Sequence, residues 1–188
     1  RRSLASVRDI QFAPSNPDVV YAVTVGGGIW RSTDSGSSWD FVGQGPNGDT
    51  RIDSVTVDWT DESRIFIAYK GTDMRHVFRS DDGGRTWTDI SGGERSPLPD
   101  IPACRVQVDN RNSNVLYVGT DIGVFRSSDG GRGFTDLLYG DGAPPRIALA
   151  SLSYEVVRSV VGAGDGFALL AFQPANMNSY AEIGIAHF

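Results

Sequence analysis

The chain has 188 residues, with 17 Lys and Arg against 23 Asp and Glu and a formal net charge of -6. This length allows one domain or two small ones, and the acidic balance argues against a nucleic-acid partner, which needs a basic face. No apolar stretch approaches the ~20 residues of a membrane span. The single cysteine, Cys104, excludes an intrachain disulfide and a Cys-rich zinc site, and we expect no metal and no cofactor. The 23 glycines indicate many tight turns between short strands.

Taken in chain order, the first unit predicts four strands, A to D. Short apolar runs at 9–12 and 19–23 flank a polar turn at 14–18, and a third run leads into a ten-residue motif at 30–39, from which a fourth strand leaves. The motif reads aromatic-Arg-Ser-x-Asp-x-Gly-x-x-aromatic. It returns at 78–87 and 125–134, at spacings of 48 and 47 residues, and 172–180 resembles a decayed copy.

A four-stranded unit that recurs every ~47 residues is typical of a propeller blade. We therefore predict an all-β fold, a single β-propeller domain over 1–188 made of four-stranded antiparallel blades. The blades are expected at 1–47, 48–97, 98–143 and 144–188. They form either a closed small ring or part of a larger one. In the fourth unit we place strands A and B within 148–161 and the loop between strands B and C at 162–166.

The motif resembles the Asp-box, or BNR repeat, of sialidases, xyloglucan-active glycoside hydrolases and sortilin-type receptors. Its Ser and Asp side chains can accept backbone hydrogen bonds, its Gly suits a positive φ, and its second aromatic side chain can fix the turn against the sheet. These features favour a structural role over a catalytic one. The structural positions are Ser32, Asp34, Gly36, Trp39, Ser80, Asp82, Gly84, Trp87, Ser127, Asp129, Gly131 and Phe134.

Antiparallel strands place their connections at alternating ends of the sheet. The A–B and C–D turns therefore share one end, and the longer B–C and D–A loops share the other, where propellers generally bind ligands. Polar side chains are also what any exposed loop carries. The candidate binding residues are Asp49, Arg51, Asp73, Arg75, His76, Arg95, Asp100, Asp121, Arg146 and Asp165. At the same end we expect Cys104 to be a small buried side chain and His76 to lie on the surface.

Asp121 is the one catalytic candidate. Thr120-Asp121-Ile122-Gly123 is similar to the stretch that carries a general-base aspartate in xyloglucan-active hydrolases. An inverting hydrolase also needs an acid roughly 6.5–9.5 Å away, which that family takes from a second propeller; here Asp73, Asp100 or Asp165 are the possible acids. A sialidase would need an arginine triad, and the Arg-Ile-Pro motif of sialidases is missing.

We expect a non-catalytic module that binds a glycan or a protein through its B–C and D–A loops. The alternative is a glycoside hydrolase, xyloglucanase-like or sialidase-like, or a fragment of one. A third hypothesis is self-association that completes the ring. The resemblance implies a secreted, bacterial-type protein at the cell surface or outside the cell. No signal peptide is visible and the chain begins at Arg1, which we interpret as a processed chain or a part of a longer one.

Overall fold

The computed structural model describes residues 6–26, 28–48, 51–71, 75–93, 96–121 and 123–137 with their side chains, and the backbone of 155–163, 167–174 and 183–187. These residues form strands and turns, and none belongs to a helix long and apolar enough to cross a membrane. The strands make four antiparallel sheets, each built from neighbours in the sequence.

The sheets follow one another along the chain. The first contains β1 (Val7–Ala13), β2 (Asn16–Thr24), β3 (Gly28–Ser32) and β4 (Asp40–Gln44). The second contains β5 (Ile52–Val57), β6 (Ile65–Tyr69), β7 (Val77–Ser80) and β8 (Thr88–Asp89). The third contains β9 (Ala103–Val108), β10 (Leu116–Thr120), β11 (Gly123–Ser127) and β12 (Thr135–Asp136). The described strands of the fourth are β13 (Glu155–Ala163), β14 (Phe167–Pro174) and β15 (Ile183–His187).

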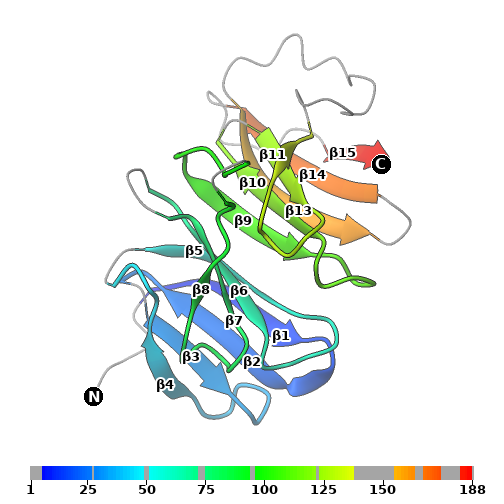
Figure 1. The fold of residues 1–188 in the computed structure, drawn as a ribbon. Helices are drawn as coiled ribbons and strands as arrows, with labels where there is room; N and C mark the ends of the chain where they lie inside the picture. Colours follow the sequence, from blue (N-terminus) through cyan, green and yellow to red (C-terminus); the bar gives the residue numbers. More distant parts are fainter. Residues whose placement is uncertain are drawn as a thin grey trace.

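The sheets stack face to face in an arc that runs from β1–β4 to β13–β15 (Figure 1). The first strands of successive sheets lie side by side: β5 packs against β1 and β2, and β9 packs against β5 and β6. This arrangement of four-stranded antiparallel sheets confirms the predicted all-β propeller architecture.

Two apolar layers hold the stack together. Between the first and second sheets, Tyr21 and Val23 pack with Val55 and Ile67, all of them fully buried. A second cluster joins the second and third sheets and includes Phe66, Ala68, Val106, Leu116 and Phe125. A middle sheet has both faces covered, so every side chain of β6 is buried. The sequence of β6 is therefore a continuous apolar run instead of an alternation of apolar and polar residues.

The fourth sheet differs from the prediction. The sequence predicts strands A and B within 148–161 and a B–C loop at 162–166. However, β13 packs against β9 and β10 as β9 packs against β5 and β6, so β13 occupies the position of strand A. The strands β13 and β14 therefore stand as strands A and B, which contradicts the predicted B–C assignment between them; residues 164–166 themselves lie outside the described residues. Local alternation could not reveal this, because contacts with the preceding sheet decide which strand lies innermost.

Candidate functional site

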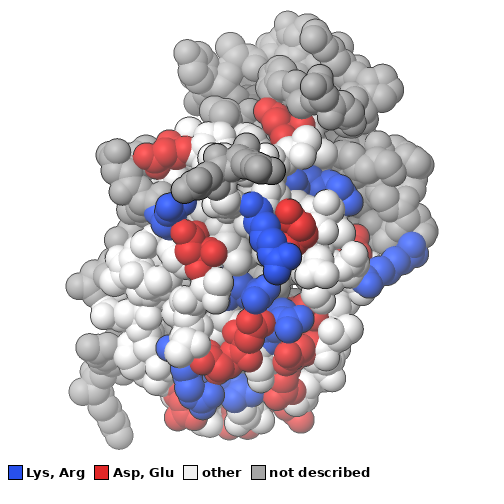
Figure 2. Space-filling view, in the orientation of Figure 1, with Lys and Arg blue, Asp and Glu red and all other residues white. Residues whose placement is uncertain are grey.

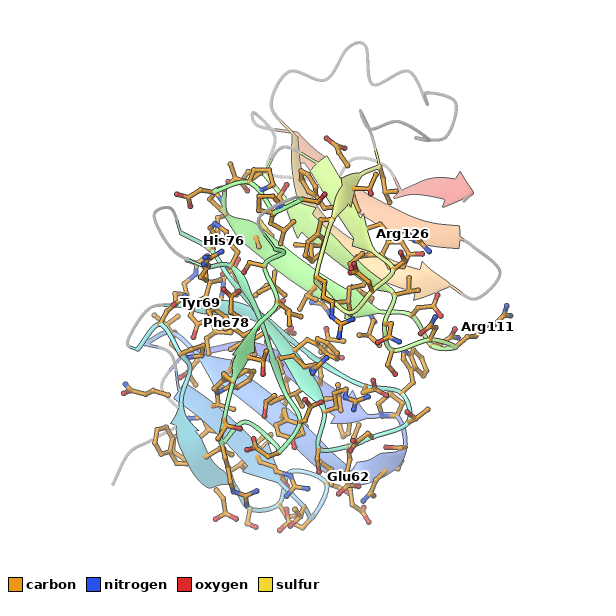
Figure 3. The ribbon with its side chains drawn as sticks, in the orientation of Figure 1. Glu62, Tyr69, His76, Phe78, Arg111 and Arg126 are labelled. Carbon is orange, nitrogen blue, oxygen red and sulfur yellow. The ribbon has the colours of Figure 1, made fainter. Side chains whose placement is uncertain are left out.

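The two ends of the sheets are connected differently, and hydrogen bonds show which connections share an end. The N–H groups of Ser35, Gly83 and Gly130, all in C–D turns, donate at 2.8–2.9 Å to carbonyls in the A–B turn or in the first residues of strand B of their own sheets. We call this the turn end. At the opposite end, the loop end, the Asn47 side chain donates to the Arg75 carbonyl at 2.9 Å. Figure 3 shows His76 at the loop end, far from Glu62 and Arg111 in the A–B turns.

The three repeated motifs form nearly identical turns, which we call the motif turns (32–39, 80–87 and 127–134). In the first, Ser32 Oγ donates to Asp34 Oδ1 at 2.7 Å and accepts from the Gly36 N–H at 2.9 Å. Asp34 Oδ1 also accepts from the Ser38 N–H at 2.8 Å. The second and third turns repeat these bonds at Ser80, Asp82, Gly84, Thr86, Ser127, Asp129, Gly131 and Gly133.

These hydrogen bonds stabilise the charged carboxylates. Bonds from Ser38, and then from Ser32, lower the pKa of Asp34 to about 2. Bonds from Thr86 lower the pKa of Asp82, and the bond from Ser127 lowers that of Asp129. The carboxylates are therefore ionised and engaged in turn closure, which is a structural arrangement and gives no acid near neutral pH.

At the loop end, each of the first three sheets has a β-bulge near the start of its first strand. The register shifts at Arg8 in β1, at Asp53 in β5 and at Cys104 in β9. A bulge redirects a side chain out of the regular pleat. Asp53, whose side chain is only 6% exposed, accepts from Arg8 Nε at 2.9 Å and pairs with Arg51 at 2.7 Å. The predicted site residue Arg51 thus lies at the bulges, where its charge is matched by Asp53.

Asp121 lies beside the third bulge. The Cys104 thiol donates to Asp121 Oδ1 at 3.3 Å, and the Asp121 N–H donates to the Pro102 carbonyl at 3.3 Å. Burial, followed by the charge of Asp121, raises the pKa of Cys104 to about 12, while the charge of Lys70 opposes this shift. Cys104 is buried, as predicted. It remains a thiol at neutral pH and positions the Asp121 carboxylate.

Of three further predicted residues, His76 and Asp100 pair with each other, and Arg75 precedes His76 in the chain. His76 is only 3% exposed, so its prediction as a surface residue is wrong. It immediately precedes β7, where its N–H donates to Ser91 Oγ at 3.1 Å, and its Nε2 lies 3.0 Å from Asp100 Oδ1. The adjacent Arg75 is exposed and pairs with Asp89 at 3.2 Å. The hydrogen bonds to Ser91 draw the end of the loop into the core, which the loop's polar sequence does not indicate.

The other candidates, Asp49, Asp73, Arg95, Arg146 and Asp165, lie outside the described residues. The candidate binding residues included none of the three bulge residues, Arg8, Asp53 and Cys104. A repeat alignment could have found them, because Arg8, Asp53 and Cys104 each stand two residues before a matched apolar position of strand A. Within the described ranges, no three His, Cys, Asp or Glu side chains gather as a metal site would require.

Grooves lie between adjacent sheets on the motif-turn side. One, of about 580 Å³, is lined by Arg79, Asp89 and Arg132 among others. A smaller one, of about 170 Å³, has the equivalent lining of Arg31, Phe41 and Arg85. Figure 2 shows acidic and basic side chains interleaved on the visible face, without a region of one sign. The grooves therefore repeat with the blades, whereas the bulge residues differ from sheet to sheet.

Sequence comparison gives partial matches to curated enzymes. A xyloglucanase of Hypocrea jecorina is 31% identical over 119 residues, which cover 63% of this chain and 14% of the enzyme. A xyloglucanase of a Paenibacillus species is 32% identical, with coverage of 46% and 10%. The chain thus spans a small part of the relatives it matches. No protein-family model matches.

Solved structures resemble nearly the whole chain. YCF48 from Cyanidioschyzon merolae matches 96% of this chain and 57% of its own, with a TM-score of 0.63 and 18% identity. The GH74 xyloglucanase from Xanthomonas campestris matches 98% and 37%, with a TM-score of 0.57 and 19% identity. The chain has a β-propeller fold. Because the sequence identities are only 18% and 19%, these structural matches show the fold of the chain and not its function.

Proposed function

We propose that this propeller is a carbohydrate-binding part of a xyloglucanase-like protein and that it contacts a β-glucan-type chain at its loop end. The observation that carries the proposal is the placement of Asp121. Its carboxylate lies at the loop end beside the bulge at Cys104, in the stretch that resembles the general-base region of xyloglucan-active hydrolases. The partial similarity to xyloglucanases supports the same substrate class.

The charges around Asp121 favour binding over hydrolysis by this chain alone. Inverting hydrolysis requires a protonated carboxyl group opposite the base. Asp53 is paired with Arg8 and Arg51, and Asp100 is paired with His76, so both carboxylates are already engaged by neighbouring side chains. Asp121 is thus the candidate base, and the acid would come from elsewhere in a larger assembly. The sialidase-like alternative has no comparable support.

The same similarity to polysaccharide-degrading enzymes supports an extracellular location, since plant-type polysaccharides are found outside the microbial cell. The binding surface would then consist of polar loop-end side chains, which can form hydrogen bonds with sugar hydroxyls.

The proposal is tested by titrating the chain with xyloglucan oligosaccharides in a calorimeter. Asp121→Asn keeps the acceptor for the Cys104 thiol but removes the charge, and we expect about tenfold weaker binding, as for the loss of a charged hydrogen-bonding group. Asp40→Asn is the matched control, because Asp40 is exposed at the start of β4, at the turn end. It should bind like the parent chain.

Reducing-sugar release is measured in parallel, and we expect none from the chain alone. Release that disappears in Asp121→Asn would instead show a stand-alone hydrolase. Absence of binding across a panel of glycans would contradict the proposal and favour a protein ligand.

A further inference from the structure

Lys70 is the loop-end counterpart of Asp121 in the neighbouring sheet. It directly follows Tyr69, the last residue of β6, as Asp121 follows Thr120, the last residue of β10. Both strand ends pair with the residue directly before a bulge, and Figure 3 shows Tyr69 at the loop end with His76. Because β9 packs against β5 and β6, the second and third sheets are adjacent. Lys70 and Asp121 therefore occupy matching positions in neighbouring sheets.

The charges of these two side chains act on the same thiol. Burial raises the pKa of Cys104, the charge of Asp121 raises it further, and the charge of Lys70 lowers it. The thiol donates to Asp121 Oδ1 at 3.3 Å. The ammonium group of Lys70 thus lies within electrostatic range of the thiol that holds the carboxylate, as the strand positions indicate.

The ammonium group is not neutralised by the protein. In the part of the chain that the structure describes, Lys70 forms no ion pair with a carboxylate. Asp53, whose charge also acts on the thiol, is engaged by two arginines. Lys70 and Asp121 are both partly exposed. A cation and an anion are therefore accessible from solvent on neighbouring sheets, with hydrogen-bonding capacity to spare.

The repeat does not require a charge at this position. Its equivalent in the first sheet is Val25, which directly follows the last residue of β2. The Val25 N–H donates to the Ser6 carbonyl at 3.1 Å, just as the Asp121 N–H donates to the Pro102 carbonyl. Valine, lysine and aspartate thus occupy the same place in three sheets. The fold accounts for the backbone geometry there and leaves the charges of the second and third sheets unexplained.

We propose that Lys70 and Asp121 together bind an uncharged sugar ring, with the ammonium group donating to one hydroxyl and the carboxylate accepting from a neighbouring one. A hydroxyl group both donates and accepts, so adjacent hydroxyls satisfy both side chains. A phosphate or a uronate would meet the negative charge of Asp121, and a cationic ligand would meet the positive charge of Lys70. This assignment rests on the proposed function and adds to it a second binding residue and a preference for neutral sugars.

The sequence offers a direct test, because Lys70 is the single lysine among 17 basic residues. An amine-directed acetylating reagent therefore reports on one lysine side chain, read by mass spectrometry. We expect a saturating neutral xyloglucan oligosaccharide to slow acetylation of Lys70 by about fivefold or more, relative to a lysine-containing reference peptide in the same tube. An oligogalacturonide at the same concentration should give no protection.

Calorimetry of a charge-removing variant provides the second measurement. Lys70→Met keeps a long side chain and should bind the neutral oligosaccharide about fivefold more weakly, because a charged donor is lost. Arg132→Met is the matched control, since it removes one exposed positive charge in a motif turn, at the opposite end of the sheets. It should bind like the parent chain. Circular dichroism checks the fold of both variants.

The outcomes separate this inference from the proposed function. Binding by the parent chain with no protection of Lys70, or with unchanged affinity in Lys70→Met, would overturn the inference and leave the proposed function standing. Equal protection by the oligogalacturonide would overturn the preference for neutral sugars. Failure of the parent chain to bind any glycan would overturn both. If Lys70→Met unfolds, the acetylation experiment decides, because it uses the parent chain.

Discussion

The motif turns at one end of the sheets repeat their chemistry from blade to blade, whereas the bulges at the opposite end do not. Each of the three turns uses one Ser–Asp pair at 2.7 Å and one glycine with φ between 88° and 95°. The three bulges at the loop end carry an arginine, an aspartate and a cysteine. The turn end is therefore built for closing each sheet, and the loop end is where one blade can differ from the next.

The largest effect should come from the glycine of the third motif turn. A Cβ on Gly131 would lie 2.6 Å from Ile90 Cβ and 2.7 Å from the Ile90 carbonyl oxygen, and its φ is +88°. We expect Gly131→Ala to reduce the free energy of unfolding by about 3 kcal/mol or more, through a backbone clash added to strain. Urea denaturation measures this.

Gly36→Ala is the control for that substitution. Gly36 has φ +91° but only Trp39 within reach, at 3.7 Å. It should lose about 1 kcal/mol from strain alone. Equal losses in the two variants would show that contact with the neighbouring sheet contributes nothing at this end.

A smaller loss is expected at the serine of the second turn. Ser80 is 1% exposed, and its Oγ accepts from the N–H groups of Gly84 at 2.8 Å and Asp82 at 3.3 Å. Ser80→Ala leaves these donors without the hydroxyl and should cost about 2 kcal/mol. Thermal unfolding measures the loss. A variant as stable as the parent would mean that water replaces the hydroxyl.

A substitution at the loop end should reduce the free energy of unfolding by less than Ser80→Ala does. Asp53→Asn removes the charge that pairs with Arg8 and Arg51, whose side chains are 35% and 38% exposed. Because both arginines reach water, we expect a loss of about 1 kcal/mol. A loss larger than that of Ser80→Ala would reverse the comparison and make the loop end a stability element.

The mildest effect is pH dependence from the motif aspartates. Their pKa values are lowered in the folded state, so the stabilisation is present above the unfolded value of about 4 and is lost as the pH falls through the folded values. For Asp34 the window extends down to about 2. Denaturation midpoints between pH 5 and pH 2 should fall for the parent chain. The decline should be shallower for Asp34→Asn, and a parallel decline would contradict this assignment.

Much of the fold was predictable because the motif constrains itself. The contacts of Ser32, Asp34 and Gly36 are all made within the turn, so their spacing alone indicated the geometry. The fourth unit was harder, since the assignment of β13 depends on its packing against β9 and β10. His76 was misplaced for a similar reason: its burial depends on Ser91, 15 residues away.

The sequence by itself determined the all-β class, the period of the blades and the closure of the motif turns, because these depend on contacts close along the chain. Tertiary structure decided what lies at the loop end. The pairing of Arg8 with Asp53 spans 45 residues and that of Cys104 with Asp121 spans 17. Only the stacking of strands β1, β5 and β9 brings the bulges of different blades together.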